Sequence, residues 1–387
     1  MLSYKLLIIT NRYPANADDG ASPFVADFVR AVRRTGIECT VLTPLHEART
    51  YDDDSGVVRF PWGEKHKTIG SLPLYNPLNW SKIVQYVRGG YREAARLHRE
   101  KNFDFCLALW AAPSGLFARR LKKDFRLPYG VWCLGSDIHT YPKIPVIRNL
   151  IVDALKNSDR VFSDGHALGE IARALSGVET HFLPSLHKIE RPPYGAPNPQ
   201  KNHFVCPGRV EPAKGIFDLL EAFRIISGKN KSWLLYYIGD GTARTKLLKQ
   251  LKKYDLDNRV LCPGFLATEE MVRVMRQARA IVIPTRLDSL PLTFGEAMQL
   301  EQPVVVTDVG DLRYFTEKYE VGLVVPPASP DHLAEALEYM INHGDDIKGK
   351  YSECVQELDV DQAADSFVKW LAEYMPARQE AQTPASC

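Results

Sequence analysis

The segment PTRLDSLPLTFGEAM, residues 284–298, follows the apolar run AIVI at 280–283 and predicts a strand that passes directly into a helix. It holds two carboxylates, Asp288 and Glu296, with seven residues between them. In an open parallel sheet, ligands bind beyond the carboxyl ends of the strands, and the first amides of the helix near Leu292 attract an anion. Carboxylates at the same place suit the hydroxyls of a sugar or ribose. The segment therefore predicts a ligand that is part phosphate and part sugar.

Length and composition set the limits for the rest of the chain. With 387 residues and 45% hydrophobic content, two domains are expected. A formal net charge of +2 argues against a dedicated nucleic-acid binder. The seven scattered cysteines are typical of reduced thiols, and we find no apolar run long enough to span a bilayer. We expect a cytoplasmic protein that is soluble or at most attached to a membrane surface.

Strands alternate with helical segments along the chain, which predicts an α/β fold of doubly wound parallel sheets. The expected strands are 5–10, 37–43, 103–109, 129–134, 160–163, 203–206, 233–238, 259–262, 280–283, 303–307 and 322–325. A proline-rich break divides this alternation in two and predicts two domains with a cleft between them. The expected parts are a first domain 1–187, a linker 188–201, a second domain 202–360, an amphipathic helix 361–375 and a disordered tail 376–387.

The loop CPGRVEPAKG, residues 206–215, follows the first strand of the second half. Gly208 permits close backbone approach, while Arg209 and Lys214 bring two cations to the strand end that the acidic pair also occupies. Arginine can fork onto phosphate oxygens and lysine acts as a point charge, so together they could neutralise a diphosphate. The alternative is a loop whose basic residues are merely solvated.

Two further glycine turns follow strands in this half. Gly239, Asp240 and Gly241 would let a nucleotide lie against backbone, and Phe265, after Gly264, could border a nucleobase. Each is equally compatible with a plain strand-to-helix turn.

The first half offers weaker candidates. Asp137 follows the strand 129–134 and could contact a sugar, orient a neighbouring residue or cap a helix. The loop 14–22 could close over an acceptor. The basic run RRLKKDFR at 119–126 could touch anionic lipid, although a solvated helix end is the simpler interpretation. The candidate proton-handling histidines, which lack a metal spacing and are more often structural, are His139, His166, His181 and His187.

Taken together, these motifs resemble the retaining, nucleotide-sugar-dependent glycosyltransferases with the GT-B fold that carry an E-x7-E motif, as in the family 4-like group. The resemblance covers most of the chain, from the first strand and loop at 7–28 to the final helix. It implies that Arg209 and Lys214 bind the donor diphosphate, Glu296 holds the ribose, and Asp288 contacts the transferred sugar. The amides that would complete this cradle belong to Leu290, Leu292 and Thr293.

The resemblance also implies the reaction and its partners. The donor would be a UDP or GDP sugar, the acceptor a glycan or lipid-linked hydroxyl in cell-surface polysaccharide biosynthesis, and Asp137 a catalytic-site residue. Fixed cations would take the place of a metal, and no cofactor is expected. The leaving phosphate would accept the acceptor proton. The final helix would return to the first domain.

Two positions depart from the family pattern. Asp288 is one methylene shorter than the Glu of the motif, and Leu134 stands where many relatives have His. These departures leave a non-catalytic nucleotide-sugar-binding scaffold as an alternative to the enzyme. A nucleotide-sugar epimerase is a further alternative, which lacks the expected set of catalytic carboxylates and His.

Overall fold

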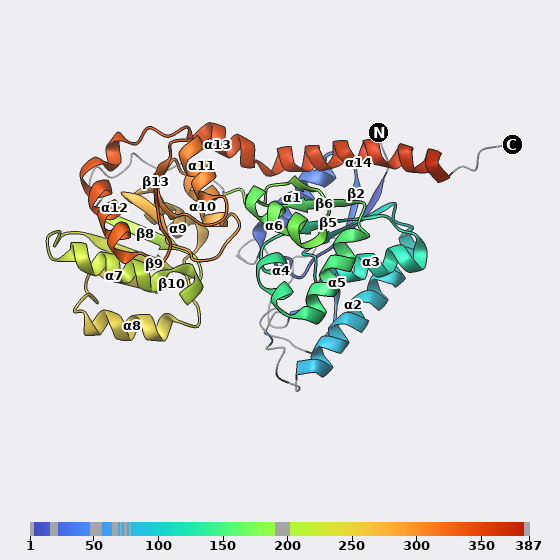
Figure 1. Cartoon of the computed structure of the whole chain (residues 1–387), viewed down its shortest axis with the longest axis horizontal. Coiled ribbons are helices and arrows are strands. Elements are labelled where there is room, and N and C mark those ends of the chain that lie inside the picture. The colour runs from blue at the N-terminus through green and yellow to red at the C-terminus, as the bar shows by residue number, and fades with distance from the viewer. Residues whose placement is uncertain are drawn as a thin grey trace. The chain divides into compact units, whose positions relative to one another are not determined.

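The chain forms two units, which the computed structural model describes over residues 4–15, 22–46, 56–63, 69, 72, 76, 79–189 and 202–382. The first unit combines Met1–Ser185 with Val360–Cys387, and the second is Leu186–Asp359 (Figure 1). Residues 190–201, which make up all but the first two residues of the expected linker, lie outside the described residues, whereas 186–189 belongs to the second unit.

The first unit is built on a seven-stranded sheet whose strands are all parallel. The order of the strands across the sheet is β3 (Val57–Phe60), β2 (Glu38–Pro44), β1 (Lys5–Ile9), β4 (Phe105–Leu109), β5 (Tyr129–Cys133), β6 (Arg160–Ser163) and β7 (Thr180–Phe182). The central strands are nearly continuous apolar runs, because helices cover both faces of a parallel sheet.

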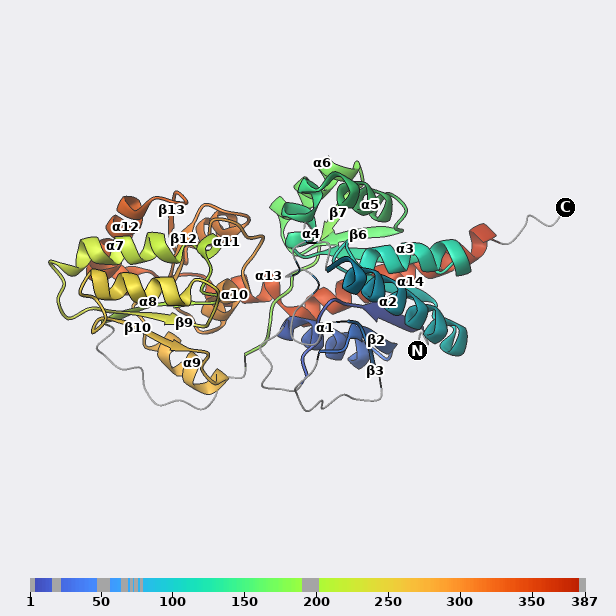
Figure 2. The ribbon, with the colours of Figure 1, turned by 90° about the horizontal axis from the view of Figure 1, so that it is seen from below.

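The helices of the first unit pack on the two faces of this sheet. They are α1 (Pro23–Arg34), α2 (Trp80–Lys101), α3 (Ser114–Phe125), α4 (Ser136–His139), α5 (Pro145–Lys156), α6 (His166–Ser176) and α14 (Val360–Gln382). Helices α2, α3 and α5 lie in a row, as the view from below shows (Figure 2). Helix α14 lies beside α1, and its Phe367 ring packs 5.8 Å from the ring of Phe28 and 5.8 Å from that of Phe162.

The second unit repeats the plan with six parallel strands. Their order is β10 (Val260–Gly264), β9 (Leu234–Ile238), β8 (His203–Pro207), β11 (Ala280–Ile283), β12 (Val304–Thr307) and β13 (Gly322–Val325). The helices are α7 (Ile216–Ser227), α8 (Arg244–Lys253), α9 (Thr268–Arg276), α10 (Leu292–Gln299), α11 (Leu312–Lys318), α12 (Pro330–His343) and α13 (Tyr351–Leu358). The structure thus confirms the predicted fold class of two doubly wound parallel sheets.

The strand order fixes where a ligand can bind in the second unit. From β8 the chain builds outward through β9 and β10 on one side, and then returns to build β11, β12 and β13 on the other. The carboxyl ends of β8 and β11 are therefore neighbours at a topological switch point, where open parallel sheets leave a crevice. The loops 208–215 and 284–291 both begin there.

Two expectations about elements need correction. The tail expected from residue 376 is helical as far as 382, because α14 runs to Gln382 and includes Pro376. Strands β3 and β7, of four and three residues, were not predicted. Both form edges of the sheet and contain half-buried residues, so neither shows the long apolar run that marks the inner strands.

Candidate functional site

The loops after β8 and β11 are locked together by their backbones. The Arg286 amide donates to the carbonyl of Ala213 at 2.8 Å. Gly215, with φ +68°, lies so close to Pro284 that a Cβ there would come within 1.8 Å of the Pro284 carbonyl oxygen. Only glycine combines this conformation with this approach. The two loops are therefore held together by backbone contact as well as by side chains.

Lys214 and Asp288 meet across these loops. The Lys214 ammonium lies 2.5 Å from Asp288 Oδ2, and the Thr285 hydroxyl donates to the same oxygen at 2.8 Å. The two charged side chains are 23% and 20% exposed, so the pair is reachable from solvent but partly desolvated. The structure thus brings together one residue assigned to the diphosphate and one assigned to the transferred sugar.

Arg209 supplies a second cation at the same strand end. Its side chain is exposed and makes no ion pair or hydrogen bond with the residues that the structure describes. The neighbouring Gly208 has φ +127° and no other atom within 4 Å of the place of a Cβ. An exposed guanidinium above an open backbone suits an incoming anion.

The loop 239–242, after β9, packs on the loop after β8. A Cβ at Gly239 would lie 2.1 Å from the Gly208 carbonyl oxygen, so glycine is required for close packing. Glu211 accepts hydrogen bonds from the Thr242 amide at 2.8 Å and from its hydroxyl at 2.5 Å. Asp240 accepts from the amide of Gly241 at 2.7 Å and so stabilises its own turn. These contacts show a structural use for the Gly-Asp-Gly turn beside any ligand contact.

Phe265 extends the same edge. It directly follows β10, and the preceding Gly264 carbonyl accepts a hydrogen bond from Gly239 at 2.8 Å. The Phe265 side chain is 79% exposed. Such an exposed ring offers a face on which a planar base can stack.

Glu296 lies in α10 and is largely buried, with 9% of its surface exposed. Burial raises the pKa of this carboxyl, and the electrostatic effect of nearby His187 partly opposes that rise. The segment 186–189 covers this part of the helix: Gln299 donates to the His187 carbonyl at 2.7 Å and accepts from the Ile189 amide at 3.1 Å. The half-buried residues around the start of this helix are Leu290, Leu292 and Thr293.

One ion pair that holds the loop after β11 in place was not predicted from the sequence. Arg286 donates two hydrogen bonds to Asp218, at 2.7 and 2.6 Å, and ties the loop after β11 to the first turn of α7. The Asp218 side chain is 10% exposed. Arg286 lies inside the quoted motif, but its partner is 68 residues away, so no local spacing could indicate the pair.

In the first unit, Asp137 of α4 is buried and held by backbone amides. The side chain is 0% exposed and accepts hydrogen bonds from the amides of Ala111 at 2.7 Å and Leu134 at 3.2 Å. It joins the chain after β4 to the chain after β5, and no side-chain hydrogen bond caps helix α4. Burial raises the pKa of Asp137 to about 6. In this structure the carboxyl is therefore engaged by backbone amides, and its assignment to the catalytic site stays a prediction.

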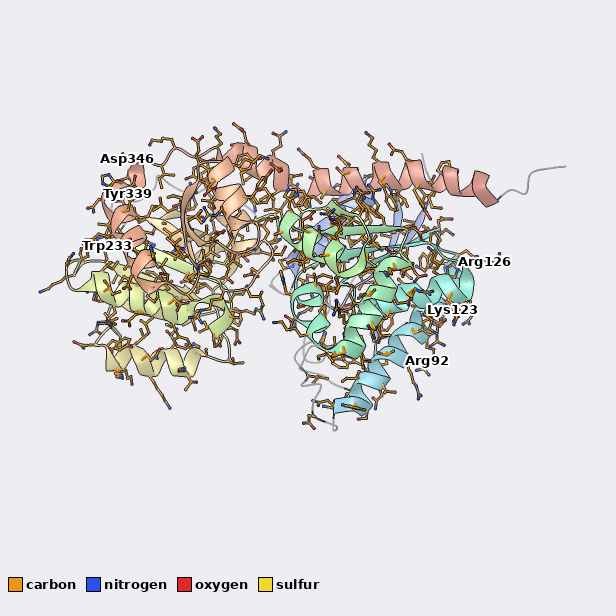
Figure 3. All side chains as sticks on the ribbon, viewed as in Figure 1. Arg92, Lys123, Arg126, Trp233, Tyr339 and Asp346 are labelled. Atoms are coloured by element: carbon orange, nitrogen blue, oxygen red, sulfur yellow. The ribbon has the colours of Figure 1, made fainter. Side chains whose placement is uncertain are left out.

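The other candidates of the first unit are mostly engaged by their neighbours. His166 stacks on Phe182 at 4.2 Å, and burial lowers the pKa of His181. In the basic run, Arg119 pairs with Asp153, Arg120 with Asp124 and Lys122 with Asp159. The remaining labelled cations of this helix end, Lys123 and Arg126, lie at the outer surface (Figure 3).

The described part of the chain holds neither a metal-binding cluster nor a membrane-spanning helix. No three acidic, His or Cys side chains in that part of the chain gather in a way that could hold a metal ion. No helix there is both long and apolar enough to cross a bilayer.

Comparison with known proteins matches both units. The family described as Glycosyl transferase 4-like domain matches residues 19–184, and Glycosyl transferases group 1 matches residues 189–356. TuaC of Bacillus subtilis (strain 168), named as a glycosyltransferase of teichuronic acid biosynthesis, is 25% identical over 356 residues, which are 86% of this chain and 88% of TuaC. The alpha-D-kanosaminyltransferase of Streptomyces kanamyceticus is 28% identical over 135 residues, 35% of each chain.

Solved structures show the same fold. Sucrose-phosphate synthase of Thermosynechococcus elongatus superimposes with a TM-score of 0.77 at 18% identity, over 97% of this chain and all of that one. HepE of Anabaena, solved in complex with UDP, gives a TM-score of 0.70 at 14% identity over 96% of this chain and 100% of HepE. The chain therefore belongs to the glycosyltransferases of the GT-B type, with a glycosyl transferase 4-like domain followed by a glycosyl transferases group 1 domain.

Proposed function

We propose that this glycosyltransferase moves a sugar, with retention of anomeric configuration and without a metal, from a UDP- or GDP-type donor to a hydroxyl of a glycan or lipid-linked acceptor. The observation that carries the donor site is the meeting of Lys214 and Asp288 beside Arg209, at the switch point between β8 and β11. A cationic pair next to a carboxylate matches a ligand with both phosphate and sugar hydroxyls.

Each residue then has a role at the donor. Arg209 and Lys214 hold the diphosphate, and the amides at the start of α10 add positive potential. Asp288 accepts hydrogen bonds from hydroxyls of the transferred sugar, while Glu296 holds the ribose hydroxyls. Phe265 borders the base. HepE, which shares the fold, has been solved with UDP and with UDP-glucose, and this supports a nucleotide-sugar donor here.

Catalysis of this reaction depends mainly on positioning the two substrates and on stabilising the charge of the leaving diphosphate. The bond from the anomeric carbon to the donor phosphate breaks, and a bond to the acceptor oxygen forms on the same face of the sugar. The leaving phosphate oxygen takes the acceptor proton. Fixed cations at Arg209 and Lys214 stabilise the negative charge that develops on the diphosphate, which is the electrostatic role a metal has elsewhere.

The acceptor is assigned by analogy with relatives. TuaC is named for teichuronic acid biosynthesis, and a matching Streptomyces coelicolor protein is named an exopolysaccharide phosphotransferase. We propose that this chain works in cell-surface polysaccharide biosynthesis, in the cytoplasm and at the inner face of the membrane, where such acceptors are assembled.

The test is binding and turnover with defined donors. We expect UDP or GDP, but not ADP, to raise the melting temperature of the purified protein, because a ligand of the native state stabilises it. Product anomers are then assigned by nuclear magnetic resonance, with and without EDTA. Inversion would contradict retention, and loss of turnover in EDTA would contradict metal independence. Donor binding with neither transfer nor donor hydrolysis would favour the scaffold.

A further inference from the structure

The start of α5 in the first unit presents apolar side chains to solvent. Ile144 is 39% exposed, Val146 is 71% exposed and Leu150 is 46% exposed, while the inner face of the helix buries Ile151 and Leu155. A helix on the surface of a soluble domain normally carries polar residues on its outer face. These three aliphatic side chains therefore leave a large part of their apolar surface uncovered by the unit itself.

Two cations lie among them. Lys143 and Arg148 are exposed, and their side chains make no ion pair or hydrogen bond with any residue that the structure describes. Residues 138–152 contain no Asp or Glu, and Asp153 is taken by Arg119 of α3. We call Lys143, Ile144, Val146, Arg148 and Leu150 the α5 surface. It is apolar and positively charged at once, unlike the run 119–126, where three cations are paired.

The α5 surface borders a hollow of about 400 Å³. Lys143, Arg148 and Asn149 line it with hydrogen-bond donors, and Val152 and Leu175 give it an apolar wall. Donors of this kind bind phosphate oxygens, and an apolar wall suits a hydrocarbon chain attached to the phosphate.

We propose that the α5 surface docks the protein on an anionic lipid bilayer, with Ile144, Val146 and Leu150 entering the interface and the two cations binding lipid phosphates. Exposed aliphatic side chains beside cations have the chemistry that binds an anionic membrane surface. A protein partner would have to supply acidic groups to both cations and an apolar cover, whereas a bilayer supplies both along one plane. The docking surface would bring the enzyme to a lipid-linked acceptor, and only this link to the acceptor rests on the proposed function.

Vesicle flotation of the full chain tests the docking surface. We expect wild type to float with phosphatidylcholine vesicles that contain phosphatidylglycerol, and not with phosphatidylcholine alone. Val146→Asp and, separately, Lys143→Gln with Arg148→Gln should each weaken this binding at least about tenfold. Donor hydrolysis by the same protein preparations is measured without lipid, and the variants should match wild type. Vesicle binding without any donor turnover would contradict the proposed function but would still support the docking surface.

Matched controls lie in the second unit. Ile225→Asp changes an aliphatic residue on α7 that is 42% exposed, and Lys249→Gln with Lys253→Gln removes two exposed cations from α8. Both should leave flotation unchanged, and an equal loss in these controls would overturn the proposal, since net charge or general apolarity would then explain the binding. Glycerol phosphate binding without flotation would assign the hollow to a free anion. Self-association that Val146→Asp abolishes, again without flotation, would assign the surface to a second copy.

Discussion

Lys214 is the side chain on which the donor site depends most directly. Lys214→Ala should weaken UDP or GDP binding about ten- to hundredfold, because a charge-assisted hydrogen bond contributes about 1.5–3 kcal/mol. Isothermal titration calorimetry measures the Kd. Lys249→Ala on α8 removes an equal charge far along the sequence and should leave the Kd unchanged. An unchanged Kd in Lys214→Ala would remove this residue from the phosphate site.

Asp288 should act on the sugar rather than on the diphosphate. Asp288→Asn keeps the shape but frees Lys214 from its ion pair, so free UDP or GDP should bind as well as before or more tightly. The kcat/KM for the sugar donor should fall about tenfold or more, because an acceptor for the sugar hydroxyls is weakened. Steady-state kinetics and calorimetry on one preparation separate the two effects. Equal losses in both would contradict the sugar role.

The buried carboxyl of Asp137 should make the free energy of unfolding depend on pH. Its native pKa of about 6 lies above the ordinary value of 3.8, so the folded state binds the proton more tightly. The stability it contributes is therefore complete below about pH 3.8 and is lost as pH rises to about 6. The free energy of unfolding of wild type relative to Asp137→Asn should fall over this window by an amount on the order of 2–3 kcal/mol. Urea unfolding across pH measures it, and a flat difference would contradict the buried titration.

At the scale of elements, the loop after β11 is held to α7 by Arg286 and Asp218. Arg286→Gln should lower the free energy of unfolding by about 1–3 kcal/mol, because the nearly buried Asp218 loses its cation. The donor KM should rise with it, because the loop also carries Asp288. Urea unfolding and donor kinetics measure the two effects.

The same helix supplies a control for this pair. Arg224 also forks onto a carboxylate, Glu221, but the Glu221 side chain is 33% exposed whereas that of Asp218 is 10% exposed. Arg224→Gln should cost less than about 1 kcal/mol and leave KM unchanged. If the two variants behaved alike, Arg286 would be an ordinary surface ion pair and not a positioning residue.

Strands and helices could be predicted from the sequence where burial produces a simple pattern of apolar residues. The inner strands β4 and β11 are apolar throughout, and β1 is apolar after Lys5, since both faces of a parallel sheet are covered. The edge strands β3 and β7 were missed, because a half-buried edge carries a mixed pattern. The end of α14 was also missed, because Pro376 reads as a helix stop although the helix continues past it.

At the scale of the whole molecule, the C-terminal helix completes the first unit. Phe367 is 0% exposed and its ring lies 6.3 Å from that of Phe105, on the central strand β4. Phe367→Ala should therefore destabilise the first unit by about 3–5 kcal/mol. Differential scanning calorimetry should show one transition lowered and a second, which UDP or GDP raises, unchanged.

A buried phenylalanine of the second unit provides the converse test, in which the second unit is destabilised and the first is not. Phe315 is 0% exposed in α11, and Phe315→Ala should lower the transition that responds to nucleotide and spare the other. A single transition that both substitutions shift equally would show that the two units unfold as one cooperative body and would contradict the separate assignment.

The sequence by itself determined the two parallel sheets and the positions of Arg209, Lys214, Asp288 and Glu296 at strand ends or in the helix that follows. These features depend on local patterns, namely apolar runs, glycine turns and the order of strand and helix. Only the tertiary structure decided that Lys214 pairs with Asp288, that Arg286 reaches Asp218 and that Asp137 is buried. The physical reason is that strand order in a doubly wound sheet differs from chain order, so contacts over 68 or 74 residues leave no local trace.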